Sequence, residues 1–208
     1  MKIHHLYTSR SERLLFLAKA LAIPHDVIAY QRDPETNMAP AALKAKHTLG
    51  TAPLLEDGDL VIAESGAAVI YMAETYGNGR LLPPKNTHDY VRCQEIIHFN
   101  EGTLMSNMIA YMSTRRSQPS QTGVLAHLQQ RIAKSLQYLA DILGEKDYLF
   151  GTLTIADIMS AFALDLLAGH TFPGMFDFTA DFVPASLCRY IENLRTLEAY
   201  QYSQRRDF

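Results

Sequence analysis

The sequence predicts a mixed α/β region followed by an all-helical region, and three observations support this division. Short apolar runs alternate with helical patterns over residues 1–82. A proline pair stands in a polar stretch at residues 83–87, which is typical of a linker. From residue 88 onward, apolar residues recur at spacings of three and four, the pattern of amphipathic helices. We therefore expect domains at residues 1–82 and 88–208, joined by a linker at 83–87.

The first region is expected to have the element order β-α-β-α-β-β-α. Its first three elements should form a right-handed unit with parallel strands. Two apolar runs then flank Asp57-Gly58, a signal of a β-hairpin. A helix over residues 65–76 completes the region, with Ser65 able to cap it and Gly77 able to end it. The elements before the hairpin are expected over residues 2–7, 11–22, 27–30 and 41–46.

The second region is expected to be helical throughout. Helical patterns cover residues 88–112, 125–143 and 155–167, and a further helix is expected after Pro184. Thr154 and Asp157 have the spacing of a capping box at the start of the third of these helices. Methionines occupy one face of the first helix, where they either fill the core or form a malleable wall for a substrate.

Composition excludes several classes of partner. The chain has 208 residues, of which 48% are hydrophobic and 20% charged, which are ordinary values for a globular protein. Its net charge of −3 offers no broad attraction to nucleic acid or to anionic lipid. No apolar run approaches the roughly 20 residues that span a bilayer, and the first residues lack the pattern of a signal peptide. We expect no nucleic-acid partner, no membrane span and a cytoplasmic location.

Cysteine and histidine usage argues against disulfide and metal chemistry. Cys93 and Cys188 are the two cysteines, and we expect them to be buried apolar side chains in a reducing compartment. His4 and His5 are adjacent on an expected strand and should point to opposite faces. The other histidines show no metal-ligand spacing, and no nucleotide-binding glycine motif is present. We therefore expect no metal and no nucleotide cofactor.

A cluster of hydroxyl and charged residues, Thr8 to Arg13, lies between the first strand and the first helix. Hydroxyl groups beside a helix N-terminus can bind an anion, because the helix dipole is positive there. Ser9-x-x-Glu12 is also a capping-box pattern, which would explain both residues structurally. The residues alone leave both interpretations open.

Two further features stand at the hairpin and after it. Pro53 opens a strand and follows Ala52, so this bond is either a cis peptide or a plain edge-strand proline. A cis bond would expose the main chain of Ala52 for pairing with an extended ligand. Glu64 and Ser65 stand at the junction of a strand and a helix, where they form either a cap or a site for an amino-acid head group.

Together, these motifs carry a resemblance to a known family through Gly50–Leu54, Ala63–Gly66 and Thr154–Asp157. In this order and spacing they resemble the cytosolic glutathione transferases, over essentially the full chain. Three further stretches are most similar to the fungal GTT-type enzymes and their bacterial relatives: His5–Ser11, Tyr30–Pro34 and His98–Met105.

The resemblance implies a thioredoxin-like domain followed by a helical bundle, with glutathione as co-substrate and a homodimeric assembly. It also implies that Ser9 is the catalytic hydroxyl, because serine-type members place it four residues before a helix-one arginine, here Arg13. Tyr7 is the rival, since tyrosine-type members carry the catalytic phenol at the end of the first strand. Ser11 is the third candidate.

The resemblance also implies the glutathione contacts. Ala52 would pair with the cysteinyl main chain, Glu64 and Ser65 would hold the γ-glutamyl end, and His47 or Arg10 would meet the glycyl carboxylate. The implied glutathione-binding set is Arg10, His47, Thr51, Ala52, Pro53, Glu64 and Ser65.

The implied activity is a glutathione S-transferase reaction in detoxification, in which the thiolate attacks a small apolar electrophile lodged between the domains. The wall of the electrophile site would come from Met105, Met108, Tyr111 and Met112. Peroxide reduction is a related activity. A non-catalytic binding or regulatory module and a glutathione-dependent isomerase or reductase are the alternatives. No cysteine lies near position 9, which disfavours disulfide chemistry.

Overall fold

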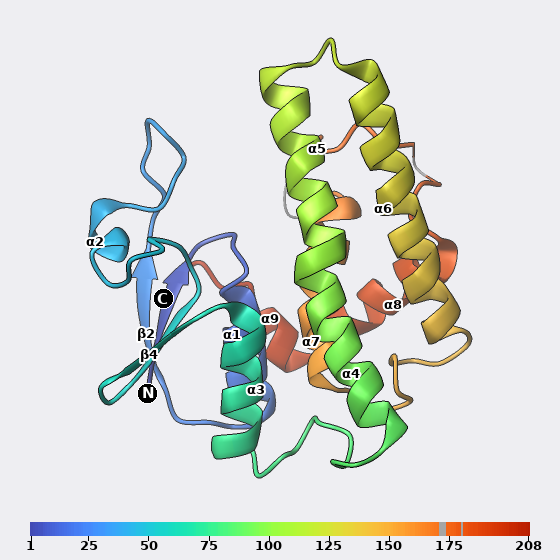
Figure 1. Ribbon diagram of the computed structural model, residues 1–208. Coiled ribbons are helices and arrows are strands. Elements are labelled where there is room, and N and C mark those ends of the chain that lie inside the picture. The colour runs from blue at the N-terminus through green and yellow to red at the C-terminus, as the bar shows by residue number, and fades with distance from the viewer. Residues whose placement is uncertain (171–173, 180) are drawn as a thin grey trace. The chain divides into compact units, whose positions relative to one another are not determined.

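The computed structural model describes residues 1–170, 174–179 and 181–208. The chain forms two compact units (Figure 1). Unit 1 consists of residues 1–84 together with 195–208, and unit 2 consists of residues 85–194. The predicted combination of an α/β part and an all-α part is confirmed, because the sheet lies in unit 1 and unit 2 is built from helices. The domain limits at residues 82 and 88 stay a prediction.

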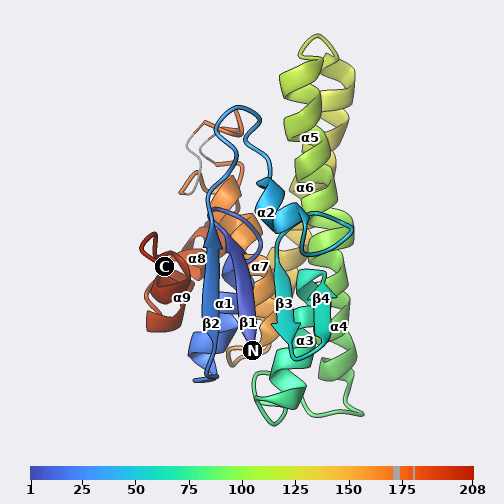
Figure 2. The ribbon, with the colours of Figure 1, turned by 90° about the vertical axis from the view of Figure 1, so that its left-hand side faces the viewer.

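Unit 1 contains a four-stranded sheet with the strand order β2-β1-β3-β4 (Figure 2). β1 and β2 are parallel, as the β-α-β pattern predicted, and β3 and β4 form the predicted hairpin. The turn of the hairpin is Gly58-Asp59, because Asp57 still pairs with Leu60. The elements of unit 1 are β1 (Lys2–Leu6), α1 (Glu12–Ala20), β2 (Asp26–Tyr30), α2 (Ala41–Lys44), β3 (Leu54–Asp57), β4 (Leu60–Ala63), α3 (Ser65–Thr75) and α9 (Glu198–Ser203).

Helix α1 contributes much of the core of unit 1, because seven of its nine residues are buried and five of these are apolar. It packs against α3 and against α9, which comes from the other end of the chain. The rings of Phe16 in α1 and Tyr200 in α9 meet edge to face with centroids 5.8 Å apart. Residues 195–208, which the sequence analysis grouped with the helical region, therefore pack with the sheet-containing unit.

Unit 2 is a bundle in which α4 packs against α7 and α5 packs against α6. Helix α7 is buried along its whole length, as its apolar sequence requires. The predicted capping box at its start is confirmed, since Asp157 accepts hydrogen bonds from the N–H and the hydroxyl of Thr154 at 2.7 and 2.8 Å. The elements of unit 2 are α4 (His88–Phe99), a π-helical segment η1 (Asn100–Met105), α5 (Ser106–Ser117), α6 (Thr122–Leu143), α7 (Ile155–Leu167) and α8 (Ala185–Arg195).

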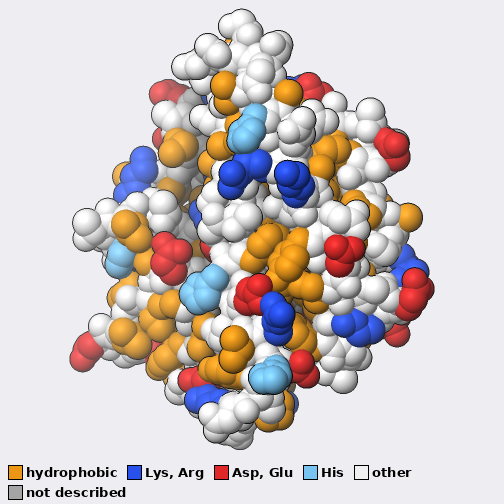
Figure 3. All heavy atoms as spheres, turned by 45° about the vertical axis from the view of Figure 1, so that its right-hand side comes forward, with side chains coloured by type: hydrophobic (Ala, Val, Ile, Leu, Met, Phe, Trp, Pro, Cys, Tyr) orange, Lys and Arg blue, Asp and Glu red, His pale blue; other side chains and the backbone are white. Residues whose placement is uncertain are grey.

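The surface and the cysteines bear on the composition argument. On the face drawn in Figure 3, basic and acidic side chains are interspersed among hydrophobic ones. No helix in the described part of the chain has both the length and the apolar character needed to cross a bilayer.

Both cysteine thiols are free; Cys93 is buried as predicted, whereas Cys188 is half-buried. The prediction for Cys188 was wrong because it lies beside the buried face of α8, not on it.

Candidate functional site

The register of the sheet brings three chain segments to one end of unit 1. β1 pairs antiparallel with β3, with His4 opposite Leu54, so the residues after β1 lie beside the residues before β3. β3 pairs antiparallel with β4, with Leu54 opposite Ala63, so α3 starts at the same end. The β1–α1 loop, the turn before β3 and the β4–α3 junction therefore lie at the same end of the sheet, where β1 and β4 end and β3 begins (Figure 2).

Ser9 lies in the β1–α1 loop, where it forms a hydrogen-bonded pair of hydroxyl groups with Ser11. The two Oγ atoms are 2.8 Å apart, and the Ser9 Oγ also accepts the N–H of Ser11 at 3.2 Å. Ser11 is fully buried, whereas Ser9 is 9% exposed. Of the two residues, Ser9 is the less deeply buried.

The Ser9-x-x-Glu12 capping box that the sequence allowed does not form. Helix α1 begins at Glu12, and the side chain of Ser9 bonds to Ser11 instead of to the N–H of Glu12. The carboxylate of Glu12 lies 3.0 Å from the Gln204 amide and 3.6 Å from the Arg206 guanidinium. Helix capping therefore does not explain the presence of Ser9.

Tyr7, the rival for the catalytic role, has its hydroxyl in another interaction. It donates a hydrogen bond of 3.2 Å to the main-chain oxygen of Phe208. The guanidinium of Arg206 lies over the Tyr7 ring, 5.7 Å from its centroid. The hydroxyl proton of Tyr7 is thus already donated within unit 1.

The peptide bond between Ala52 and Pro53 is cis, one of the two states that the sequence allowed. Ala52 is in the same buried apolar cluster as Leu6 of β1. Within the described part of the chain, no backbone hydrogen bond uses the N–H or the C=O of Ala52. Thr51 beside it is exposed. An extended peptide can pair with unused main-chain groups of this kind.

The start of α3 is shaped by Glu64 and Ser65. Glu64 has φ 71° and ψ 112°, a conformation that residues other than glycine rarely adopt and that is found mainly at functional sites. The prediction that Ser65 caps α3 is wrong, because Glu64 holds the cap position and Ser65 is the first helical residue. The Ser65 hydroxyl instead accepts a hydrogen bond of 3.0 Å from the buried guanidinium of Arg13. This bond ties the start of α1 to the start of α3.

His47 and Arg10 are the predicted partners of the glycyl carboxylate. His47 follows α2, and its Nδ1 accepts the N–H of Leu49 at 3.2 Å. Arg10 is half-buried in the β1–α1 loop. Among the residues that the structure describes, no group of three or more His, Cys, Asp or Glu side chains is placed to hold a metal ion.

The four residues predicted for the electrophile site all lie in unit 2. Met105 in η1 and Met108 in α5 are buried, as is Tyr111, while Met112 is half-buried. The Tyr111 hydroxyl donates to the carboxylate of Asp177. Burial, followed by this bond, raises the pKa of Tyr111 to about 12.

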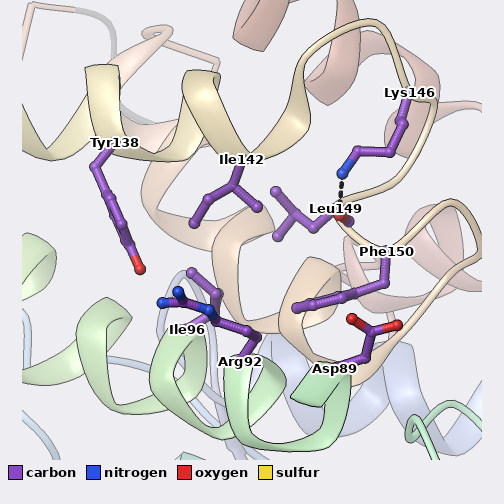
Figure 4. Close-up of a pocket in the computed structure, with 8 residues that line it drawn as sticks. All are labelled: Asp89, Arg92, Ile96, Tyr138, Ile142, Lys146, Leu149 and Phe150. Atoms are coloured by element: carbon purple, nitrogen blue, oxygen red, sulfur yellow. Dashed lines mark hydrogen bonds between the residues drawn. The ribbon is translucent and has the colours of Figure 1, made fainter. Parts of the chain in front are cut away.

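Unit 2 also contains a pocket of about 410 Å³ with an apolar floor and charged residues at its rim (Figure 4). Three of its polar residues are already paired: Tyr138 and Arg92 both bond to Glu95, and Lys146 donates to the carbonyl of Leu149 at 2.9 Å. It includes none of the predicted site residues. It is lined by Asp89, Arg92, Ile96, Tyr138, Ile142, Lys146, Leu149 and Phe150.

Comparisons with known proteins bear on the family resemblance and on the fold. The profile of the family described as glutathione S-transferase, N-terminal domain, matches residues 2–74. Glutathione S-transferase 1 of Saccharomyces cerevisiae is 24% identical over 226 aligned residues, covering 98% of this chain and 94% of the yeast protein. The crystal structure of a glutathione S-transferase from Actinobacillus pleuropneumoniae is 25% identical with a TM-score of 0.84, covering 97% of this chain and 90% of that one. The first part of this chain therefore matches the glutathione S-transferase N-terminal domain, and the whole chain is similar to glutathione transferases in sequence and fold.

A further solved member of the family comes from a sphingomonad and is complexed with glutathione. It is 17% identical with a TM-score of 0.78, covering 98% of this chain and 97% of that one. The fold predicted from the resemblance, a thioredoxin-like α/β part followed by a helical part, is therefore confirmed for this chain.

Three residues that shape the candidate site were not identified as site residues from the sequence. Arg13 bonds to Ser65, and Arg32 donates a hydrogen bond of 2.8 Å to the carbonyl of Thr8, which has φ 58°. The third, His5, bonds to Ser11. One signal was available: Arg13 is a charged residue within an apolar helical stretch, and a buried charge requires a partner.

Proposed function

We propose that this protein is a glutathione S-transferase in which Ser9 stabilises the glutathione thiolate for attack on a small apolar electrophile. The observation that carries the proposal is that three chain segments meet at the same end of the sheet. Each segment offers a different group: a hydroxyl at Ser9, unused main-chain groups at Ala52, and the start of a helix at Ser65. The hydroxyl can donate to a thiolate, the main-chain groups can pair with a peptide, and the helix start can bind a carboxylate.

In the proposed complex, the N–H and C=O of Ala52 pair with the cysteinyl main chain. The Ser65 hydroxyl accepts from Arg13, so its own proton can be donated to the carboxylate of the γ-glutamyl end. Glu64 accepts from the γ-glutamyl ammonium. We propose that His47 or Arg10 binds the glycyl carboxylate. Thr51 and Pro53 complete the proposed set of glutathione contacts.

Thiol activation is the main energetic requirement. A free thiol has a pKa of about 8.5 and is mostly protonated at neutral pH. Lowering this value by about 2 units requires about 2.7 kcal/mol of preferential stabilisation of the anion. A hydrogen bond from Ser9 and the positive end of the α1 dipole can together supply about that much. The occupied hydroxyl of Tyr7 and the buried position of Ser11 favour Ser9 for this role.

The proposed reaction is a nucleophilic substitution or addition at an electrophilic carbon. The thiol proton passes to solvent, and the sulfur electron pair forms the new carbon–sulfur bond. The bonding pair of the leaving group departs with it, or the electrons of a polarised double bond move to the neighbouring atom, which then takes up a proton. We propose that the apolar wall for the electrophile comes from Met105, Met108, Tyr111 and Met112.

The first test is binding of glutathione by calorimetry, with ultraviolet detection of the bound thiolate from pH 5 to pH 9. The wild type should bind glutathione saturably with a thiol pKa below that of the free tripeptide. Ser9→Ala should raise this pKa and slow conjugation, because it removes the donor to sulfur. Ser117→Ala, an exposed serine at the end of α5, is the matched control and should change neither.

Other outcomes would redirect the proposal. An unchanged pH profile in Ser9→Ala together with a shifted one in Tyr7→Phe would move the catalytic role to Tyr7. Binding without turnover would favour a binding or regulatory module, and turnover of peroxides or of isomerisable substrates would favour those related activities. No binding at millimolar glutathione would overturn the proposal. The proposal also includes a cytoplasmic location, a homodimeric assembly and a role in detoxification. Sedimentation of the purified protein tests whether it is a dimer.

A further inference from the structure

His5 is a fully buried histidine that the proposed chemistry does not yet use. It is the fourth residue of β1, and its side chain points to the opposite face from that of His4, which bonds to Tyr30 and Glu56. Its ring meets those of Tyr7 and Phe208 edge to face, with centroids 4.9 and 5.6 Å away. Burying a polar ring in this way costs free energy unless its nitrogen atoms form hydrogen bonds.

The ring takes part in a chain of hydrogen bonds that ends at Ser9. The Nδ1 of His5 lies 2.8 Å from the Oγ of Ser11, which in turn lies 2.8 Å from the Oγ of Ser9. His5 and Ser11 are both completely buried, whereas Ser9 is 9% exposed. The chain of hydrogen bonds therefore runs from the fully buried His5 to Ser9, the one of its three residues that retains some exposure.

The tautomer of His5 limits which way the hydroxyl protons point, because each serine has only one. If the ring proton is on Nδ1, it is donated to Ser11, and the proton of Ser11 is then available for the Ser9 Oγ at 2.8 Å or for the Leu6 carbonyl at 3.2 Å. When it goes to Ser9, at the shorter distance, the Oγ of Ser9 accepts from Ser11 and its own proton is free for a ligand. If the ring proton is on Nε2, Ser11 donates to Nδ1, and Ser9 must use its proton on Ser11.

The surroundings of the ring favour the first arrangement. Within the described part of the chain, Nε2 has no hydrogen-bond partner, so a proton there would be a buried donor without an acceptor. On Nδ1 the same proton has the Ser11 oxygen at 2.8 Å. Burial, with a smaller contribution from the charge of Arg206, lowers the pKa of His5 to about 4, so the ring carries a single proton at neutral pH.

We propose that His5 is a positioning residue whose Nδ1–H, acting through Ser11, turns the hydroxyl proton of Ser9 toward the glutathione sulfur. This inference rests on the proposed function, since it supplies the direction of the hydrogen bond that activates the thiol. His5 itself touches neither the substrate nor the reacting atoms. It acts only through the hydroxyl group of Ser11.

The experiment measures the thiol pKa of glutathione bound to the variant His5→Leu. Leucine fills a similar volume but cannot donate a hydrogen bond to Ser11. We expect this pKa to rise by about one unit, a tenfold loss of thiolate below both values. Glutathione binding at pH 5, where the thiol is protonated, should be unchanged. His5→Asn, whose amide can donate from near the Nδ1 position, should restore part of the shift. His4→Leu, the neighbouring buried histidine, should cause none.

A second pair of measurements tests the route of the effect. His5→Leu combined with Ser9→Ala should raise the thiol pKa no further than Ser9→Ala alone, since both changes remove the same hydrogen bond. Nitrogen NMR of the wild-type ring should show a protonated Nδ1 and a bare Nε2, a result that does not depend on any variant folding. Ser11→Ala should have the same effect on the thiol as His5→Leu.

The outcomes separate this inference from the function on which it rests. If the wild type does not bind glutathione or does not lower its thiol pKa, the proposed function fails and the role of His5 fails with it. If a lowered thiol pKa depends on Ser9 but persists in folded His5→Leu, only the positioning role is overturned. A ring protonated on Nε2 in the free protein would also overturn the positioning role alone.

Discussion

At the scale of single residues, Glu56 shows how a partly exposed charge can respond to pH. It lies on β3 and accepts hydrogen bonds from the Lys2 ammonium at 2.6 Å and from the His4 Nε2 at 3.1 Å. These bonds, that of Lys2 first, lower the pKa of Glu56 to about 2. A carboxylate with a lowered pKa in the folded state contributes stability above its unfolded value, and this contribution is lost as the pH falls toward about 2.

Glu56→Gln should therefore reduce the loss of stability between pH 5 and pH 2. At pH 7 the variant should be less stable than the wild type, and by pH 2 the difference should have narrowed, because the wild-type carboxylate is then protonating. Urea midpoints at several pH values measure both. Glu145→Gln, a control at a fully exposed carboxylate, should follow the wild type throughout. Parallel curves for wild type and Glu56→Gln would show that the hydrogen bonds of Glu56 contribute nothing.

At the scale of elements, the two ends of α6 offer a comparison between glycines. Gly144 ends the helix with φ 54° and ψ −129°, a conformation open only to glycine. Gly123 is the second residue of the same helix and has a negative φ in helical geometry, with open space where a Cβ would lie. Gly144 directly follows the helical pattern over residues 125–143, where glycine is a common stop signal.

Gly144→Ala should destabilise unit 2 by about 1–3 kcal/mol, the usual cost of holding a residue with a Cβ in a sparsely populated backbone conformation. Gly123→Ala should be neutral or stabilising by up to about 1 kcal/mol, since alanine is the better helix former. Chemical denaturation of both variants tests the pair. Equal effects of the two substitutions would mean that backbone conformation does not control this helix end.

At the scale of the whole molecule, the last residues of the chain complete the first unit. Tyr200 of α9 is 5% exposed and packs against Phe16 of α1, although the two residues are far apart in sequence. Within the described residues, its buried hydroxyl has no hydrogen-bond partner. The ring of Tyr200 therefore contributes to stability through packing and not through its hydroxyl.

Two substitutions separate these contributions. Tyr200→Ala should cost about 3–5 kcal/mol, as expected when a large buried ring is removed. Tyr200→Phe should be neutral or slightly stabilising, because it removes a buried polar atom without a partner. Thermal or denaturant unfolding measures both variants. A large loss in Tyr200→Phe would reveal a hydrogen bond at this hydroxyl and contradict the packing argument.

Much of the fold could be predicted from local patterns. Alternating strands and helices, the hairpin near Gly58 and the capping box at Thr154 depend on residues close together in the chain. The helical pattern over 88–112 was predicted as one run, and the structure divides it by the π-helical segment η1. That division was not predicted, because the chain is helical on both sides of η1 and no proline marks the π-helical turn.

The candidate site was only partly predictable. Ser9, Ala52 and Glu64 could be identified as candidates from motifs and from the family resemblance, and their roles stay proposals. The competing uses of Ser9 and Ser65 as helix caps were excluded only by contacts with Ser11 and Arg13. These contacts depend on how α1 is seated against α3, which no local pattern describes.

By itself, the sequence determined the order of the elements in the sheet-containing region, the two-part character of the chain and the resemblance to glutathione transferases, because these follow from periodicity, turn residues and motif spacing. Only the tertiary structure decided that residues 195–208 pack with the sheet-containing unit, and that Arg13 holds Ser65. It also decided that a buried His5 lies behind Ser11 and Ser9. Hydrogen bonds between distant residues depend on positions in space that are set when the whole unit packs, so they leave no periodic trace in the chain.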